Sequence, residues 1–265
     1  MQQATRPRVS VVTVVLDDPE GLLLTIESVL SQSYRNIQFV VVDGGSKADT
    51  VDLIEVYKHD IDIIVSEADR GIYDAMNKGL MRADGEWISF MNSGDVFFSR
   101  DTIFETFGSV IPMNIKILFG DVVVKYPSGD NLLIAANINE LNRGMGFCHQ
   151  SAFIRTEFHQ LRPFDLEYKY AADFAFFYKA NREKNRFLYL NKIVSKVRYG
   201  GLSNINRGEV FWEYFKIMKC EAWHIRFYFL FKIIDSQIRT LAKIILPKSL
   251  IIHIFRRRLK RQRKI

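Results

Sequence analysis

The sequence has few of the features that mark several common classes of protein. It contains only two cysteines, Cys148 and Cys220, which lie far apart and form no CxxC pair. This argues against a disulfide framework and against a structural zinc site. No GxGxxG segment follows the first apolar run, which excludes the usual dinucleotide-binding fingerprint. There is also no internal repeat and no low-complexity linker.

The sequence also shows no pattern typical of a targeting segment or a membrane-spanning segment. The first ten residues, MQQATRPRVS, have no apolar stretch before Val9, so we expect no secretory signal peptide. No uninterrupted apolar run reaches the roughly 18 to 20 residues that a membrane-spanning helix needs. We therefore expect a protein that works in the cytoplasm.

The net charge of +7 is confined to one end of the chain. Residues 248–265 carry eight lysines and arginines and no acidic residue, so the preceding residues have a net charge of −1. Because the main part of the chain is close to neutral, we expect no nucleic-acid partner for it.

The first hundred residues alternate between continuous apolar runs and amphipathic stretches. We expect strands at residues 9–15, 37–42, 61–65 and 87–91, with helices between them. Strands that are apolar throughout, rather than at every second position, are typical of a parallel sheet covered on both faces. In such sheets the ligand binds beyond the carboxyl ends of the strands.

Acidic residues follow each of these expected strands. Asp17 comes after the first, Asp43 ends the second, Glu67 and Asp69 follow the third, and Asp95 follows the fourth. A single acidic residue in a loop is usually a solvated turn. Acidic residues at all four strand ends along one edge of a sheet predict a site there.

The second half of the chain is less regular. We expect strands at 115–125, 132–136, 150–155 and 192–199, and a helix at 171–181. The simplest division is a catalytic domain over residues 1–206 and a C-terminal extension over residues 207–265. In the extension, apolar residues at helical spacing predict an amphipathic helix: Phe227, Leu230, Phe231, Ile234, Ile238, Leu241 and Ile245. With the basic tail, this pattern favours a helix that lies on an anionic membrane surface; packing against the catalytic domain is the alternative.

Several short segments occur in a telling order: VSVVTVVLDD, SVLSQSY, VVDGGSKADT, EADRGIYDAMNKGL, WISFMNSGD, CHQSAF, YAADFAFF and YGGLS. In order and spacing, residues 9 to about 205 resemble the family 2 inverting glycosyltransferases of the GT-A fold. Within that family they are similar to enzymes of bacterial capsule, colanic acid and O-antigen assembly. The resemblance implies an α/β, Rossmann-like, mostly parallel sheet with helices on both faces, followed here by C-terminal amphipathic helices.

The resemblance also implies a donor, an acceptor and a set of binding residues. The donor would be a nucleotide diphosphate-sugar, most often a UDP-sugar, and the acceptor a lipid-linked sugar at the inner face of the bacterial cell membrane. The residues implied for the nucleotide and donor are Thr13, Asp43, Asp69, Arg70, Asn77 and Asn92. Those implied near the diphosphate or acceptor are His149, Gln150, Gly200, Gly201 and Ser203, with Arg198 or Arg207 close by.

A metal site is implied by the segment NSGD, residues 92–95, which stands in the place of the family's acidic DXD motif. That motif holds Mn²⁺ or Mg²⁺ on the donor diphosphate. Here Asn92 and Gly94 occupy positions where acids are common, so Asp95 is the remaining carboxylate. One carboxylate can suffice when substrate phosphates complete the coordination shell.

The family's catalytic base matches Asp173 in YAADFAFF. An inverting displacement needs a carboxylate that accepts the proton of the attacking hydroxyl. Asp173 is flanked by Ala172 and Phe174, an apolar setting that we expect to raise its pKa.

Two other functions compete with this interpretation. A sugar-phosphate nucleotidyltransferase needs a glycine-rich basic loop after the first strand, and the corresponding segment here, LDDPEG, is acidic. A non-catalytic scaffold that binds sugar or lipid would use the same fold without turnover.

Overall fold

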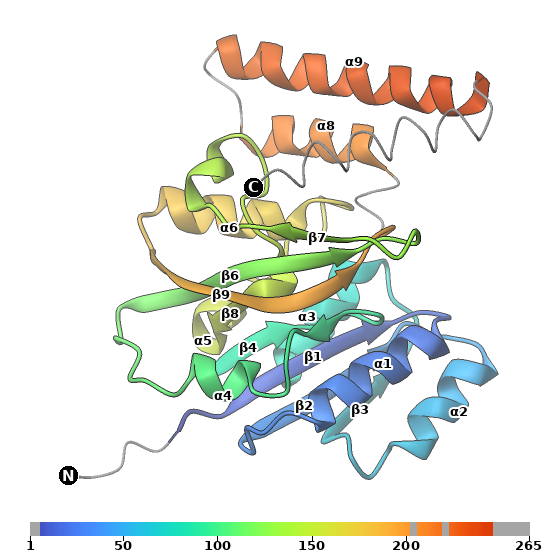
Figure 1. The fold of residues 1–265 in the computed structure, drawn as a ribbon, viewed down its shortest axis with the longest axis vertical. Helices are drawn as coiled ribbons and strands as arrows, with labels where there is room; N and C mark the ends of the chain where they lie inside the picture. Colours follow the sequence, from blue (N-terminus) through green and yellow to red (C-terminus); the bar gives the residue numbers. More distant parts are fainter. Residues whose placement is uncertain (1–5, 202–205, 219–222, 246–265) are drawn as a thin grey trace. The chain divides into compact units, whose positions relative to one another are not determined.

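The computed structural model describes residues 6–201, 206–218 and 223–245. The chain divides into two compact units, Met1–Tyr199 and Gly200–Ile265, each described here by itself (Figure 1). The division falls seven residues before the boundary that we place between residues 206 and 207.

The first unit is an α/β domain. Its strands are β1 (Val9–Val15), β2 (Ile37–Asp43), β3 (Ile63–Ser66), β4 (Trp87–Phe90), β5 (Val96–Phe97), β6 (Ile115–Lys125), β7 (Asn131–Ile134), β8 (Ala152–Arg155) and β9 (Arg186–Arg198). Its helices are α1 (Pro19–Leu30), α2 (Ala48–Val56), α3 (Ile72–Arg82), α4 (Thr102–Thr106), α5 (Thr156–Gln160) and α6 (Ala172–Arg182), with 3₁₀ turns η1 (Ile138–Asn142) and η2 (His149–Ser151). The strands and helices expected in the first hundred residues are all present, whereas the short elements β5, α4 and α5 were not predicted.

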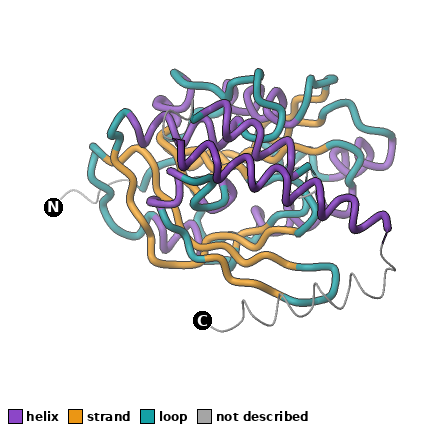
Figure 2. Tube along the Cα trace, turned by 90° about the horizontal axis from the view of Figure 1, so that it is seen from above, coloured by secondary structure: helices purple, strands orange, loops and turns teal. Residues whose placement is uncertain are grey.

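The strands form one nine-stranded sheet in the order β3-β2-β1-β4-β8-β6-β9-β5, with β7 paired to β6. The first four strands run parallel to one another. β8 joins this half antiparallel, between β4 and β6, and β9 runs parallel to β6. The predicted mostly parallel α/β sheet is confirmed, and Figure 2 shows the curvature of its strands.

Helices cover both faces of the parallel half, as the continuous apolar strands require. Val11 of β1 belongs to a buried cluster with Leu22 of α1 and Ile54 of α2. Val12, the next residue, faces α3, where a Cβ on Gly79 would come within 2.3 Å of its side chain. Glycine at position 79 therefore lets α3 lie close against the sheet.

The carboxyl ends of the parallel strands lie at one edge. Val15 of β1 is in register with Asp43 of β2, which is in register with Ser66 of β3. The backbone N–H of Ser93, just after β4, donates to the carbonyl of Val14. The polar residues after these strands consequently meet where the sequence predicts a site.

The described residues of the second unit form two helices, α8 (Arg207–Ile217) and α9 (Trp223–Ile245). The predicted amphipathic helix is confirmed as α9, and α8 lies within the predicted helical extension, although its bounds were not predicted. Phe229 is fully buried and its ring centroid lies 6.4 Å from that of Tyr214 in α8. The opposite side of α9 exposes a row of apolar side chains: Trp223, Phe227, Leu230, Phe231, Ile234 and Ile238. Among the described residues, no helix combines the length and the apolar character needed to cross a bilayer.

Candidate active site

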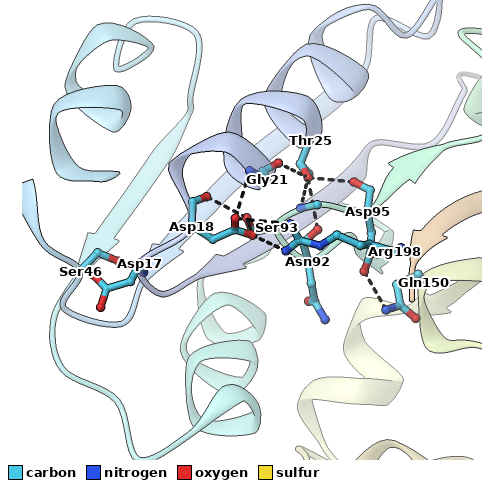
Figure 3. A network of polar contacts seen from close by, with 11 residues as sticks. Asp17, Asp18, Gly21, Thr25, Ser46, Asn92, Ser93, Asp95, Gln150 and Arg198 are labelled. Carbon is cyan, nitrogen blue, oxygen red and sulfur yellow. Dashed lines mark hydrogen bonds and ion pairs between the residues drawn. The ribbon is translucent and has the colours of Figure 1, made fainter. Parts of the chain in front are cut away.

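The loop after β4 is the centre of the polar network drawn in Figure 3. Thr25 of α1 holds this loop, because its hydroxyl donates to the carbonyl of Asp95 at 2.8 Å and accepts the N–H of Gly94 at 3.0 Å. Gly94 has a φ of +87°, which a glycine adopts without strain. The loop is thus fixed to the start of α1 before any ligand binds.

Asp95 is the buried carboxylate of this loop, with 6% of its surface exposed. Its Oδ1 accepts the backbone N–H of Arg198 at 3.0 Å, and its Oδ2 accepts from Nε2 of Gln150 at 2.8 Å. Burial raises the pKa of Asp95, and these two hydrogen bonds only partly oppose the rise. The negative charge of Asp95 is therefore incompletely compensated by its surroundings.

Arg198, the last residue of β9, reaches across the loop to Asp18. Its Nη2 lies 2.5 Å from Oδ2 of Asp18, which also accepts the hydroxyl of Ser93 at 3.0 Å. A Cβ on Gly94 would come within 2.8 Å of the guanidinium carbon, so the glycine makes room for this cation. Burial alone would raise the pKa of Asp18, but the bonds from Arg198 and Ser93 outweigh it and lower the pKa.

A second chain of contacts leads from the same loop to α6. Nδ2 of Asn92 lies 3.2 Å from Nε2 of His149, and Nδ1 of His149 lies 3.0 Å from Oδ2 of Asp173. Oδ1 of Asp173 accepts the hydroxyl of Tyr73 and the N–H of Phe174, both at 2.8 Å. The predicted residues Asn92, His149 and Asp173 are therefore brought together, and Gln150 and Asp95 lie beside them.

The expectation of a raised pKa for Asp173 is wrong. Burial does act in that direction, but the hydrogen bond and charge of His149, followed by the bonds from Tyr73 and Phe174, outweigh it and lower the pKa. The apolar neighbours in sequence do not determine the environment of this carboxylate. Its polar partners come from α3 and η2.

Asn92 carries a buried acceptor in the loop after β4. Its Oδ1 has no hydrogen-bond partner among the described residues and almost no exposed surface. An unpaired buried oxygen of this kind costs about 1–3 kcal/mol, which a ligand hydroxyl or N–H at this position would recover.

Thr13 and Asp43 are fully buried. The hydroxyl of Thr13 donates to the carbonyl of Met91, and Asp43 accepts from the N–H of Ser46 and the hydroxyl of Ser66. In this conformation both side chains hold together the loops at the strand ends. Their contacts with a nucleobase stay predictions.

Asp69 and Arg70 lie in the loop before α3. Oδ1 of Asp69 accepts the N–H of Gly71, and a Cβ on Gly44 would come within 2.2 Å of the other carboxylate oxygen. The absence of a side chain at Gly44 therefore allows this acid to lie over the end of β2. Arg70 is largely exposed and pairs with Asp74 at 3.2 Å.

Asn77, which the resemblance assigns to the donor, is hydrogen-bonded within the protein in this conformation. Its amide exchanges two hydrogen bonds with the backbone of Phe164, at 2.8 and 2.9 Å. Both of its polar atoms are thus used within the protein. Gly200 and Gly201 begin the second unit, and Ser203 lies outside the described residues.

Two contributors to the site were missed from the sequence. From the sequence, Asp18 is interpreted only as the start of a helix, because it precedes Pro19. Tyr73 is interpreted as an apolar position of α3. The signal for Asp18 is its place after the first strand, next to Asp17. Nothing in the local sequence of Tyr73 points to Asp173, which is 100 positions away.

The described residues contain no group of three or more His, Cys, Asp or Glu side chains that would hold a metal ion by themselves. The donor set at Asp95 nevertheless fits a hard divalent cation. Each of its oxygens accepts one hydrogen bond from the protein, which leaves a lone pair on each, and carboxylate oxygen is a preferred ligand of Mg²⁺ and Mn²⁺. The raised pKa of Asp95 shows that a positive charge beside it would be stabilising. The remaining ligands would have to come from substrate and water.

The fold and the polar edge define an α/β enzyme whose site is built for a small charged substrate. Residues 10–112 match the family model described as glycosyl transferase family 2. A PGL/p-HBAD biosynthesis glycosyltransferase of Mycobacterium bovis is 28% identical over 216 residues, which cover 75% of this chain and 80% of the relative. An uncharacterized glycosyltransferase of Mycobacterium tuberculosis is 40% identical over 98 residues, or 37% of each chain.

Solved structures resemble the fold at low sequence identity. A mannosyltransferase from Pyrobaculum calidifontis, PcManGT, in complex with GDP-Man and Mn²⁺, has a TM-score of 0.65 and 15% identity, covering 95% of this chain and 79% of that one. S. aureus TarS 1–349 in complex with UDP has a TM-score of 0.62 and 17% identity, covering 91% and 76%. For the longer S. aureus TarS chain the match spans 40% of its length.

These matches confirm the predicted resemblance and fold. Residues 10–112 match the glycosyl transferase family 2 model, the chain has the fold of the GT-A glycosyltransferase structures, and these findings together with the glycosyltransferase relatives indicate a transferase.

Proposed function

We propose that this enzyme transfers one sugar from a nucleotide diphosphate-sugar to a lipid-linked oligosaccharide, with inversion at the anomeric carbon. The observation that carries the proposal is the linkage of two carboxylates at one edge of the sheet. Asp95 accepts from Gln150, and the adjacent His149 contacts Asp173. One carboxylate is thus available to the leaving group and the other to the attacking hydroxyl.

The donor is a nucleotide diphosphate-sugar, and we favour a UDP-sugar. Support comes from structural neighbours that contain UDP, UDP-GlcNAc or GDP-Man. The unpaired Oδ1 of Asn92 offers a ribose or sugar hydroxyl a buried acceptor. Asp43 and Asp69, at the ends of β2 and β3, stand on the side of the loop where the nucleoside would lie.

Asp173 is the proposed base. Its lowered pKa keeps it ionised at neutral pH, so it is ready to accept a proton. A carboxylate of lowered pKa is a weak base in the ground state. It acts because the hydroxyl becomes strongly acidic only as its oxygen bonds to the anomeric carbon.

The leaving diphosphate needs positive charge, and the site offers it in two forms. Arg198 presents a planar fork of N–H donors that suits phosphate oxygens. A divalent cation, Mn²⁺ or Mg²⁺, would be held by Asp95 together with diphosphate and water, and would supply charge stabilisation to the departing oxygen. The complex of PcManGT with Mn²⁺ supports a cation requirement.

We place the reaction in bacterial surface polysaccharide assembly, of the capsule, colanic acid or O-antigen kind, at the cytoplasmic face of the cell membrane. The motif order supports this placement. The exposed apolar row of α9 and the basic residues of the tail sequence supply a means of holding the enzyme at an anionic surface, where a lipid-linked acceptor resides.

The decisive experiment measures release of nucleotide diphosphate from a panel of UDP-, GDP- and TDP-sugars, with and without Mn²⁺, in the presence of lipid-linked acceptor. We expect release with one class of donor, and little release without the cation. No release from any donor would contradict the proposal. Analysis of the product linkage then tests inversion.

A further inference from the structure

The imidazole of His149 is shared by the donor loop and the proposed base. Nε2 faces Nδ2 of Asn92 at 3.2 Å, and Nδ1 faces Oδ2 of Asp173 at 3.0 Å. An amide nitrogen only donates and a carboxylate only accepts. The contact with Asp173 therefore requires a hydrogen on Nδ1, which makes this nitrogen the donor to the carboxylate, while Nε2 faces the amide of Asn92.

We propose that His149 is a positioning residue for the transfer reaction: it couples Asn92 to Asp173 and leaves one lone pair of Asp173 Oδ2 for the acceptor hydroxyl. The inference rests on the proposed function of Asp173 as the base. It assigns to His149 a role that neither its position in the sequence nor its distance from the strand ends predicts.

The hydrogen bonds of Asp173 determine where a proton can arrive. Oδ1 already accepts two hydrogen bonds, from Tyr73 and from Phe174, which use both of its lone pairs. Oδ2 accepts one, from His149. The free lone pair on Oδ2 is thus the place for the acceptor hydroxyl.

In the transfer reaction, Oδ2 of Asp173 receives the proton of the acceptor hydroxyl. The acceptor oxygen forms its bond to the anomeric carbon while its O–H bond breaks and the proton moves to Oδ2. The bond from the anomeric carbon to the diphosphate oxygen breaks, and its electron pair leaves with the diphosphate. Without the N–H of His149, the carboxylate could rotate and Oδ2 would lose its fixed direction.

The link to Asn92 gives His149 its second function. Asn92 follows β4 in the donor loop, and its Oδ1 is the buried oxygen without a partner among the described residues. A donor hydroxyl that bonds to this oxygen fixes the amide, and the amide fixes Nε2 of the ring. Donor binding would therefore stabilise the arrangement in which the base is aligned.

Among the described residues, few titratable side chains face Asp173. His149 and Cys148 approach from the segment around η2, and Tyr73 approaches from α3. Burial, with Asp95 and Asp173 nearby, raises the pKa of the Cys148 thiol to about 12, so this group stays neutral. Removing the His149 N–H should raise the pKa of Asp173, because that hydrogen bond is one of the causes that lower it.

Two substitutions of His149 separate its contacts. In His149→Asn the amide nitrogen can take the place of Nδ1 and still donate to Asp173. In His149→Gln the longer side chain brings its amide near the place of Nε2, toward Asn92, and removes the Nδ1 donor. We propose to measure kcat, the KM for donor, the pH dependence of kcat from the lowest pH at which the protein stays folded up to pH 8, and binding of the nucleotide diphosphate by calorimetry.

For His149→Gln we expect kcat to fall by ~10- to 100-fold, less than the ~10²- to 10⁴-fold of general base catalysis itself because the base is retained, and the acid limb of its pH profile to move upward by about one unit. In His149→Asn we expect most of the wild-type kcat and an acid limb close to its wild-type pH. The affinity for the nucleotide diphosphate should change by less than about threefold in both His149 variants. Tyr73→Phe, which removes a donor on Oδ1 instead, should move the acid limb the same way.

Equal losses of kcat in both His149 variants without movement of the acid limb would overturn the inference, and so would full activity of His149→Gln. If neither His149 variant folds, an unmoved acid limb in Tyr73→Phe overturns it. Absence of transfer by the wild-type enzyme would instead contradict the proposed function.

Discussion

The guanidinium of Arg198 and the carboxylate of Asp18 lie 2.5 Å apart and join the end of β9 to the N-cap of α1, 180 positions apart in the chain. Figure 3 shows the Arg198 side chain directed toward Asp18, and the guanidinium lies against Gly94, beside the proposed diphosphate position. A diphosphate offers Arg198 two negative charges in place of one carboxylate. We therefore expect this ion pair to open when the donor binds.

The first prediction concerns Arg198→Gln. Loss of the cation should lower kcat by ~100-fold, because a charged donor aimed at a leaving group is worth about 10²- to 10³-fold in rate. The control is Lys196→Gln, which removes one positive charge from the same strand, where the Lys196 side chain lies near the ring of Phe98. Similar kinetics in the two variants would show that only net charge matters.

The second prediction concerns Asp95→Asn. The protein should fold, because an asparagine oxygen can still accept the N–H of Arg198 and the amide of Gln150 can turn to match. The Mn²⁺ concentration for half-maximal activity should rise at least ~10-fold, since a neutral amide is a far poorer ligand for a hard cation. A titration of activity against Mn²⁺ measures this, and an unchanged curve would exclude Asp95 as a ligand.

How much of the structure can be predicted from the sequence depends on how far apart in the chain the contacting residues lie. The parallel strands were predictable because a strand buried on both faces is apolar along most of its length, as residues 9–15 are apart from Ser10 and Thr13. The polar edge followed from the rule that parallel strands end together. Asn92, His149 and Asp173 were predicted as site residues from motifs, and the structure brings them together.

The electrostatics of the site could not be predicted in the same way. The apolar residues beside Asp173 in the sequence predicted a raised pKa, but Tyr73 and His149 reverse its direction from 100 and 24 positions away. Asn77 looked available to a ligand because its partner, Phe164, is 87 positions away. Hydrogen bonds between distant segments leave no periodic pattern in the sequence.

The third prediction separates the two interpretations of Asn77. If its amide serves the backbone of Phe164, Asn77→Ala should lower the free energy of unfolding by about 1–3 kcal/mol and leave the KM for donor unchanged. Asn77→Asp keeps the acceptor for the Phe164 N–H and loses only the donor, so its stability should be intermediate near neutral pH. Denaturant unfolding and donor kinetics provide the two measurements. A higher KM with unchanged stability would restore the predicted donor contact.

The fourth prediction tests the exposed apolar row of α9. Phe231 is 67% exposed, and burying its side chain in a lipid surface is worth about 1.5–3 kcal/mol. Phe231→Glu should therefore weaken binding to anionic vesicles by at least ~10-fold in a flotation assay. Gln237→Glu, at an exposed polar position of the same helix, adds the same charge without removing apolar surface and should weaken binding much less. Equal effects would mean that charge alone holds the protein to the vesicle.

The fifth prediction concerns His159, which is fully buried among Phe90, Phe164 and Phe176. Burial lowers its pKa from 6.5 to about 4, although Nδ1 lies 3.1 Å from the carbonyl of Arg162. Between these values the unfolded chain binds a proton that the folded chain does not. Stability should therefore fall as the pH is lowered from about 6.5 to about 4, by up to about 3 kcal/mol.

His159→Phe should remove this part of the pH dependence, whatever it does to stability at neutral pH, because phenylalanine does not titrate. The measurement is the free energy of unfolding by denaturant at pH 7, 5.5 and 4.5, compared between variant and wild type. His59→Phe, at an exposed position, is the matched control and should leave the slope with pH nearly unchanged. If His159→Phe keeps the wild-type slope, the loss of stability in acid has another origin, such as protonation of the ion-paired Asp18, because lowered carboxylate pKa values act in the same direction at still lower pH.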